Sequence, residues 1–208
     1  MPHPVKKDVQ SVLAPYHARI RKVVERAWDE WRTVAAFRAE KHFAPVMYPR
    51  TIANYVFDAI ARYAVSEFGA EPSVNVRIEP QTVKFIFKAA VLARFKKGDD
   101  NGLGQNTPTQ AALAFADPDG VFPDLPPETA KVEFIWRPNE IQTSLGLVLV
   151  VARDNDRLLW HYEIEPSEPG SGSGTIIPFP TPPTSPDGSE SEPLVKPKKP
   201  DIKKSEEE

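Results

Sequence analysis

The chain has 208 residues, with 26 basic and 29 acidic side chains, which is enough for one ordinary domain and a tail. Cysteine is absent, which excludes disulfides and thiolate metal sites and fits a reducing cytoplasm. The longest apolar run, residues 145–152, is too short to span a bilayer as a helix, and the first residues lack the apolar core of a signal peptide. We therefore expect a cytoplasmic protein without a membrane-spanning segment.

Residues 1–44 predict a long amphipathic helix. Large apolar residues recur in steps of three and four from Val9 to Phe43, and Pro15 should kink or break the helix. This apolar stripe can pack on the chain's own core or on a partner helix, and its short length favours the chain's own core.

Residues 45–165 predict an α+β domain that begins with a second helix. Pro49 suits the first turn of that helix, and Gly69 suits its end. Arg50, Asn54 and Asp58 recur one turn apart on one side of it. They form either a solvated face or a polar cluster that supports a ligand site.

Alternating apolar residues predict strands at 74–78, 83–87 and 91–95. A short helix at 110–116, capped by Thr109, should follow, and then strands at 131–136, 145–151 and 157–164. The expected fold is therefore α+β: two N-terminal helices packed on a mainly antiparallel sheet of about five to six strands.

Residues 166–208 predict a disordered tail. Ten of the 23 prolines lie there, with Ser-Gly repeats, a Lys-Pro block and a terminal run of glutamates. The tail holds 5 basic and 8 acidic residues, which leaves 21 of each sign in residues 1–165. A neutral domain argues against indiscriminate nucleic-acid binding, although a local basic patch remains compatible with it.

No catalytic motif accompanies this fold. The four histidines have no metal-ligand spacing, and neither a Gly-x-Ser-x-Gly elbow nor a complete phosphate loop is present. We therefore expect no metal site and no cofactor, and we favour a protein that is not an enzyme.

The candidate site is a cluster of cations where an apolar strand ends. Arg94, Lys96 and Lys97 come just before a polar segment that contains Asn106, Thr107 and Gln110. These six residues predict an anion-binding or phosphate-binding site, and the alternative is a solvated strand end. Arg94 lies deeper in the strand and is expected to pair with Asp58 or Glu133. The phenylalanines of this region fit the core better than a base-stacking platform: Phe85, Phe87 and Phe95.

Three segments resemble an uncharacterised family of bacterial and prophage proteins: Arg50-Thr-x-Ala-x-x-Val-Phe-Asp58, Arg94-Phe-Lys-Lys97 and Asn106-Thr-Pro-Thr-Gln-Ala111. The resemblance runs from the second helix through Leu125-Pro126 toward Trp160 and leaves out the first helix and the tail. A glycine-tyrosine pair expected near the third-last strand is replaced by Glu133-Phe134.

Members of this family tend to be encoded beside a helix-turn-helix protein with an IrrE-type metallopeptidase domain, an arrangement similar to toxin–antitoxin or phage-defence pairs. Together with the absent catalytic motif and the long amphipathic first helix, this arrangement predicts a non-catalytic binding component that acts through protein–protein contacts with such a regulator, with an effector or toxin as one form of it. It assigns no catalytic residue. The alternative is a protein that binds or processes nucleic acid through the cationic strand end at Arg94–Lys97.

Overall fold

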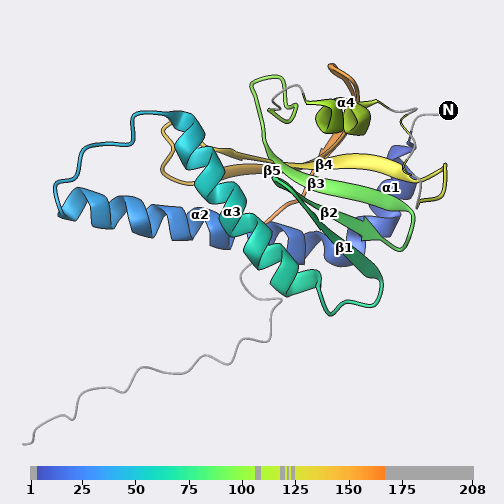
Figure 1. The fold of residues 1–208 in the computed structure, drawn as a ribbon, viewed down its shortest axis with the longest axis horizontal. Coiled ribbons are helices and arrows are strands. Elements are labelled where there is room, and N and C mark those ends of the chain that lie inside the picture. The colour runs from blue at the N-terminus through green and yellow to red at the C-terminus, as the bar shows by residue number, and fades with distance from the viewer. Residues whose placement is uncertain (1–3, 106–108, 118–119, 121, 123–124, 167–208) are drawn as a thin grey trace, which may run out of the picture. The chain divides into compact units, whose positions relative to one another are not determined.

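In the computed structural model the described residues are 4–105, 109–117, 120, 122 and 125–166 (Figure 1). These residues belong to one compact unit, and they form helices and a six-stranded, mostly antiparallel sheet. The expected α+β class is therefore confirmed. The predicted tail and the predicted site residues Asn106 and Thr107 lie outside the described residues.

The first helical segment breaks where Pro15 predicts a break. Helix α1 (Lys6–Leu13) leads into the short 3₁₀ helix η1 (Ala14–Tyr16), and α2 (His17–Glu40) follows. Proline has no backbone N–H to donate, so it fits the start of a new turn better than the interior of a helix. The buried side chains of α2 all lie in its first half: Ile20, Arg21, Val23, Val24, Ala27 and Trp28.

The second long helix, α3 (Pro49–Phe68), starts and stops as its proline and glycine predict. Pro49 occupies the first turn, where no backbone donor is needed. Gly69 caps the end in an ordinary helical conformation, with φ −64°, and its N–H donates to the carbonyl of Val65 at 2.8 Å. The buried residues of α3 begin at Val56.

The sheet has the strand order β1-β2-β3-β4-β5-β6. The strands are β1 (Val74–Glu79), β2 (Thr82–Phe87), β3 (Val91–Lys97), β4 (Ala130–Pro138), β5 (Leu145–Asp154) and β6 (Arg157–Glu163). Every neighbouring pair is antiparallel except β3 and β4, which are parallel. Parallel neighbours need a crossover connection, and here it carries the predicted short helix α4 (Gln110–Ala116).

The main core lies between one face of the sheet and helices α1, α2 and α3. Phe85, Phe87 and Phe95 all belong to it, with 0%, 0% and 2% of their surfaces exposed, so they cannot form an open stacking surface. The first half of α2 thus packs on the chain's own core, as its stripe favours.

The opposite face of the sheet, called the outer face below, carries two smaller apolar clusters. Phe115 of α4 covers Ile86 and Leu92, on β2 and β3. Leu103, in the loop after β3, packs with apolar residues of β4 and β5: Ile135, Leu149 and Val151. On the outer face, charged side chains of β3, β4 and β5 lie between helix α4 and the loop that carries Leu103.

Candidate functional site

The three predicted cations of β3 differ in exposure. Arg94 has only 4% of its surface exposed, whereas Lys96 and Lys97 are half-buried. Arg94 and Lys96 share the outer face because side chains alternate along a strand. The alternative of a solvated strand end therefore does not describe Arg94.

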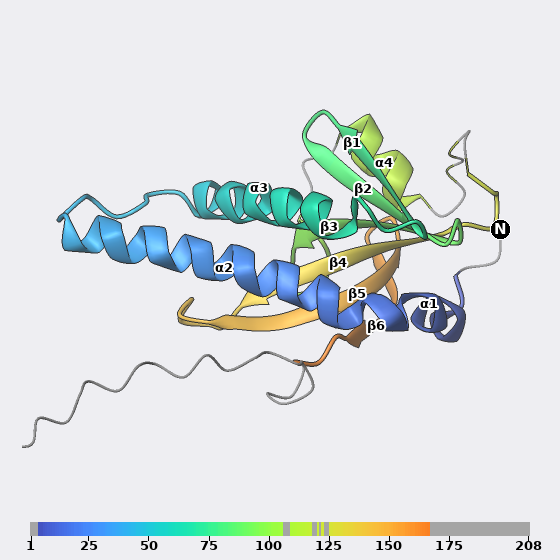
Figure 2. The ribbon, with the colours of Figure 1, turned by 90° about the horizontal axis from the view of Figure 1, so that it is seen from below.

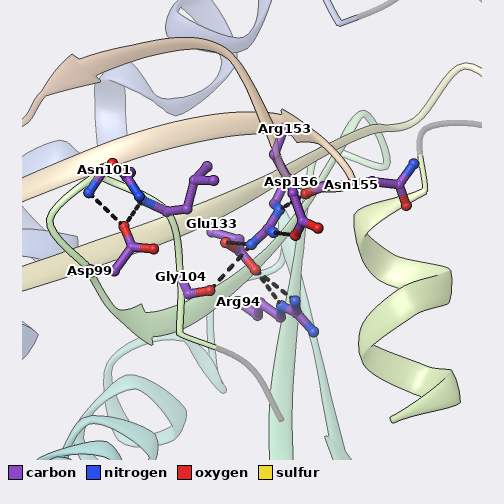
Figure 3. A network of polar contacts seen from close by, with 9 residues as sticks. Arg94, Asp99, Asn101, Gly104, Glu133, Arg153, Asn155 and Asp156 are labelled. Carbon is purple, nitrogen blue, oxygen red and sulfur yellow. Dashed lines mark hydrogen bonds and ion pairs between the residues drawn. The ribbon is translucent and has the colours of Figure 1, made fainter. Parts of the chain in front are cut away.

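Arg94 pairs with Glu133, one of its two predicted partners (Figure 3). The two residues face each other across the parallel β3–β4 pair, and Arg94 Nε and Nη2 lie 3.0 and 2.6 Å from Glu133 Oε1. Glu133 has 0% of its surface exposed. The other predicted partner, Asp58, is exposed on α3, and its carboxylate accepts from Arg62 at 3.3 Å.

A second arginine approaches the other oxygen of the same carboxylate. Arg153 Nη1, from the end of β5, lies 3.3 Å from Glu133 Oε2 and 3.2 Å from the carbonyl oxygen of Gly104 (Figure 3). Its other nitrogens donate to the β5–β6 turn, at Asn155 O and the Asp156 carboxylate. We call Arg94, Glu133 and Arg153 the Glu133 network.

The Glu133 network is closed on both sides. The Arg94 guanidinium lies 4.0 Å from the ring centre of Phe115 in α4. On the other side, the loop passes so close that a Cβ on Gly104 would lie 2.5 Å from Glu133 Oε2. The network therefore joins three strands, a loop and a helix. This geometry fits a role in stabilising the fold better than an open anion-binding site.

Burial lowers the pKa of Arg94, and the neighbouring Glu133 carboxylate opposes that shift. The guanidinium remains charged at neutral pH because arginine is not deprotonated in proteins. Burial also lowers the pKa of Lys96, and the charge of Arg94 lowers it further. Because Glu133 already accepts from Arg94, this guanidinium is not available to hold a phosphate at the strand end.

The remaining predicted site residues lie on helices. Gln110 is exposed at the start of α4, where Thr109 Oγ1 accepts from the N–H of Ala112 at 3.2 Å, as the predicted cap requires. Arg50 and Asn54 are exposed on α3. Arg50 stacks over the ring of Tyr48 at 5.0 Å, so its contact is local to the start of its own helix.

A different candidate site lies at the far end of the two long helices. No residue from 29 to 55, a stretch that the structure describes throughout, is buried. The second half of α2, the connection and the start of α3 form an arm, which we define as residues 29–55 (Figure 2). Trp31 and Ile52 pack partly buried against the core, and the far end of the arm extends past it (Figure 2).

Glu30 holds the base of this arm together. Its carboxylate accepts from the hydroxyls of Tyr55 and Tyr63 at 2.8 and 2.7 Å, and from Arg62 at 2.8 Å. The rings of Trp31 and Tyr55 pack with their centres 5.5 Å apart. The hydrogen bonds from Tyr63 and Tyr55 lower the pKa of Glu30, and burial only partly opposes them.

The end of the arm is apolar and exposed. We define the arm tip as residues 37–50, and its exposed large apolar residues are Phe37 (53%), Phe43 (55%), Met47 (79%) and Tyr48 (54%). Sequence reasoning missed this site, because it assigned the stripe as far as Phe43 to one buried face. The signal was present in the run Phe43-Ala-Pro-Val-Met-Tyr-Pro49, which is apolar yet contains two helix-breaking prolines.

The structure also holds a cleft of about 570 Å³ beside α1. Its wall includes Val5, Val9 of α1, Phe115, and the cations Lys131 and Arg153. Both cations already donate to neighbouring groups: Lys131 to the carbonyls of Asp117 and Gly120, and Arg153 within the Glu133 network. The cleft therefore offers mainly apolar contact.

Comparisons with known proteins add no relative: no protein-family model, curated protein or solved structure matches the chain. Within the part of the chain that the structure describes, none of the helices has both the length and the apolar character needed to cross a membrane. Function is therefore inferred from the residues and their contacts.

Proposed function

We propose that this protein is a non-catalytic binding component of a bacterial two-protein module of the toxin–antitoxin or phage-defence kind. Its partner is the helix-turn-helix regulator with an IrrE-type metallopeptidase domain that the sequence resemblance implies. The protein acts through protein–protein contacts, as the effector or toxin of the pair, and the arm is the element that makes them.

The observation that carries this proposal is the exposed arm. Residues 29–55 add nothing fully buried to the core, yet Glu30 and its three donors hold the two helices of the arm together. Ordering a chain segment costs conformational entropy, and exposed apolar side chains forgo the stabilisation that burial would give. A rigid arm with an apolar end is typical of a surface that is covered in a complex.

The contacts of the Glu133 network support a binding role over an enzymatic one. Both arginines and the carboxylate are engaged with each other and with the covering loop and helix. The nucleic-acid alternative stays a prediction, with Lys96 and Lys97 as its remaining contacts.

The test is co-expression with the product of the neighbouring gene, which the resemblance predicts to be a helix-turn-helix protein. We expect the two chains to co-purify and to elute as one complex of defined mass in size-exclusion chromatography with light scattering. We also expect one gene to change the growth effect of the other. The proposal is wrong if no complex forms and neither gene alters the growth phenotype of the other. The nucleic-acid alternative would be favoured if the wild type binds a DNA or RNA oligomer in a salt-dependent way and the double variant Lys96→Ala/Lys97→Ala does not.

A further inference from the structure

Three aromatic rings of the arm tip are each matched with a cation. The Lys41 ammonium lies 5.7 Å from the ring centre of Phe37, the Arg38 guanidinium lies 5.7 Å from that of Phe43, and Arg50 lies 5.0 Å from that of Tyr48. All three rings are more than half exposed. Cation–ring contacts of this kind hold the cation beside an apolar surface while its outward donors remain available.

The charge of the arm tip is predominantly positive. No acidic residue occurs between Lys41 and Phe57, and the nearest acid before them is Glu40. The three cations Arg38, Lys41 and Arg50 thus face a single carboxylate within the tip. Two copies of the tip would repel each other, so a second copy of this chain is a poor occupant.

From this geometry we propose that the arm tip inserts into an apolar pocket of a partner protein whose rim carries Asp and Glu side chains. The rings and Met47 fill the pocket, and Arg38, Lys41 and Arg50 pair with the rim carboxylates. Aromatic residues and arginines are the side chains that most often dominate binding energy at protein interfaces. This inference rests on the proposed function and names the part of the partner that the arm recognises.

A protein pocket fits the tip better than other anionic surfaces. Glu40 has 68% of its side chain exposed and lies 2.8 Å from Lys41, so a lipid or phosphate surface would meet a like charge there. A protein rim can place a donor opposite Glu40. The apolar tip residues also exceed what a phosphate backbone can use, because phosphate contacts need donors alone.

The experiment is a calorimetric titration of the full chain with the helix-turn-helix partner protein. Phe43→Ser and Met47→Ser test the apolar contact, and Lys41→Glu and Arg50→Glu test the charge. Matched controls lie away from the arm: Ile78→Ser replaces an apolar residue with 72% exposure, and Lys88→Glu replaces an exposed lysine that lies 6.0 Å from the ring of Tyr16.

We expect each tip variant to weaken binding by about tenfold or more, and each control to change it by less than about twofold. The Lys41→Glu and Arg50→Glu variants should also reduce the salt dependence of binding. Because the replaced side chains are exposed, all variants should keep the thermal melting curve of the wild type. If one apolar variant fails to fold, the charge-reversal variants still test the inference.

Each other outcome has a defined meaning. If the partner binds the wild type and all four tip variants equally, the inference is overturned and the proposed function stands. If the partner does not bind the wild type, both are overturned. The last outcome is that phosphatidylglycerol vesicles or a DNA duplex bind the wild type but do not bind the tip variants. The tip then recognises lipid or nucleic acid, and the inference of a protein pocket is overturned.

Discussion

The Glu133 network and the arm tip use the same chemical groups with opposite exposure. In the network, the Arg94 guanidinium lies 4.0 Å from the ring centre of Phe115, and both residues are buried. In the arm tip, Arg50 lies 5.0 Å from the ring centre of Tyr48, and both residues are exposed. A cation beside an aromatic ring therefore does not define a function by itself.

The difference between the two regions lies in what surrounds the cation. Arg94 meets a fully buried carboxylate, so its charge is compensated inside the protein. The tip cations face a single acid, Glu40, and Arg38 also donates to the carbonyl of Ala44 at 2.8 Å, so part of their positive charge has no compensating carboxylate in the tip. A closed network stabilises the fold when intact, whereas an open set of like charges selects an oppositely charged surface.

The largest effect should follow from removing the shared carboxylate. Glu133→Ala removes the carboxylate that two nearly buried guanidinium groups, those of Arg94 and Arg153, share. Breaking a buried pair in this way typically costs about 3–5 kcal/mol. Urea unfolding followed by the fluorescence of the buried Trp28 and Trp136 measures the change. Glu140→Ala, at an exposed loop position, is the control, and a loss below about 1 kcal/mol at Glu133 would show that the network is not structural.

The second effect tests how closely the loop covers the network. In Gly104→Ala the new methyl group would lie 2.5 Å from Glu133 Oε2 and 2.9 Å from Lys96 Cβ. Overpacking of this kind costs about 1–3 kcal/mol, because the loop or the carboxylate must shift. The same unfolding assay measures it. An unchanged unfolding midpoint would mean that the loop moves away freely and the network is open.

The elements of the fold could be predicted because their signals are local. Pro15, Pro49 and Gly69 mark helix boundaries that the structure keeps. Alternating or continuous apolar residues similarly predicted all six strands, and the Thr109 cap predicted the helix at 110–116. The parallel pairing of β3 with β4 was not predicted, because strand order depends on contacts between distant segments and not on local pattern.

The candidate site was only partly predictable. The depth of Arg94 in its strand made Glu133 one of its two predicted partners. The acid in the apolar strand Val132-Glu-Phe-Ile-Trp136 is a signal that separates Glu133 from Asp58, because a buried acid needs a compensating cation. Arg153 gave no such signal, since an arginine beside a turn is ordinarily solvated. The arm was missed because the spacing of apolar residues is the same where α2 packs on the core and where it extends past it.

A smaller effect concerns the base of the arm. Glu30→Gln should lower stability at neutral pH by about 1 kcal/mol, because the hydrogen bonds from two tyrosines and Arg62 lose their charged acceptor. The folded state lowers the pKa of Glu30, so its contribution is present at neutral pH. That contribution is lost as the pH falls below the ordinary glutamate value of about 4.3 and through the folded pKa.

The difference in unfolding free energy between the wild type and Glu30→Gln should therefore shrink on acidification. Unfolding curves at neutral and acidic pH measure it. Asp58→Asn is the control, because the exposed Asp58 meets the same Arg62 at 3.3 Å with no tyrosine donor. A difference that stays constant with pH would show that the tyrosines do not hold the ionised form of Glu30.

The smallest effect on stability is expected at the arm tip, and it sharpens the contrast with the network most directly. Phe43→Ala and Phe115→Ala both remove a ring that an arginine covers, Arg38 in one case and Arg94 in the other. Phe43 is 55% exposed and Phe115 only 2% exposed. Phe43→Ala should therefore change the unfolding free energy by no more than about 0.5 kcal/mol, whereas Phe115→Ala should cost about 3 kcal/mol. Equal losses in the two variants would mean that the arm tip is covered within the protein itself and is not a free docking surface.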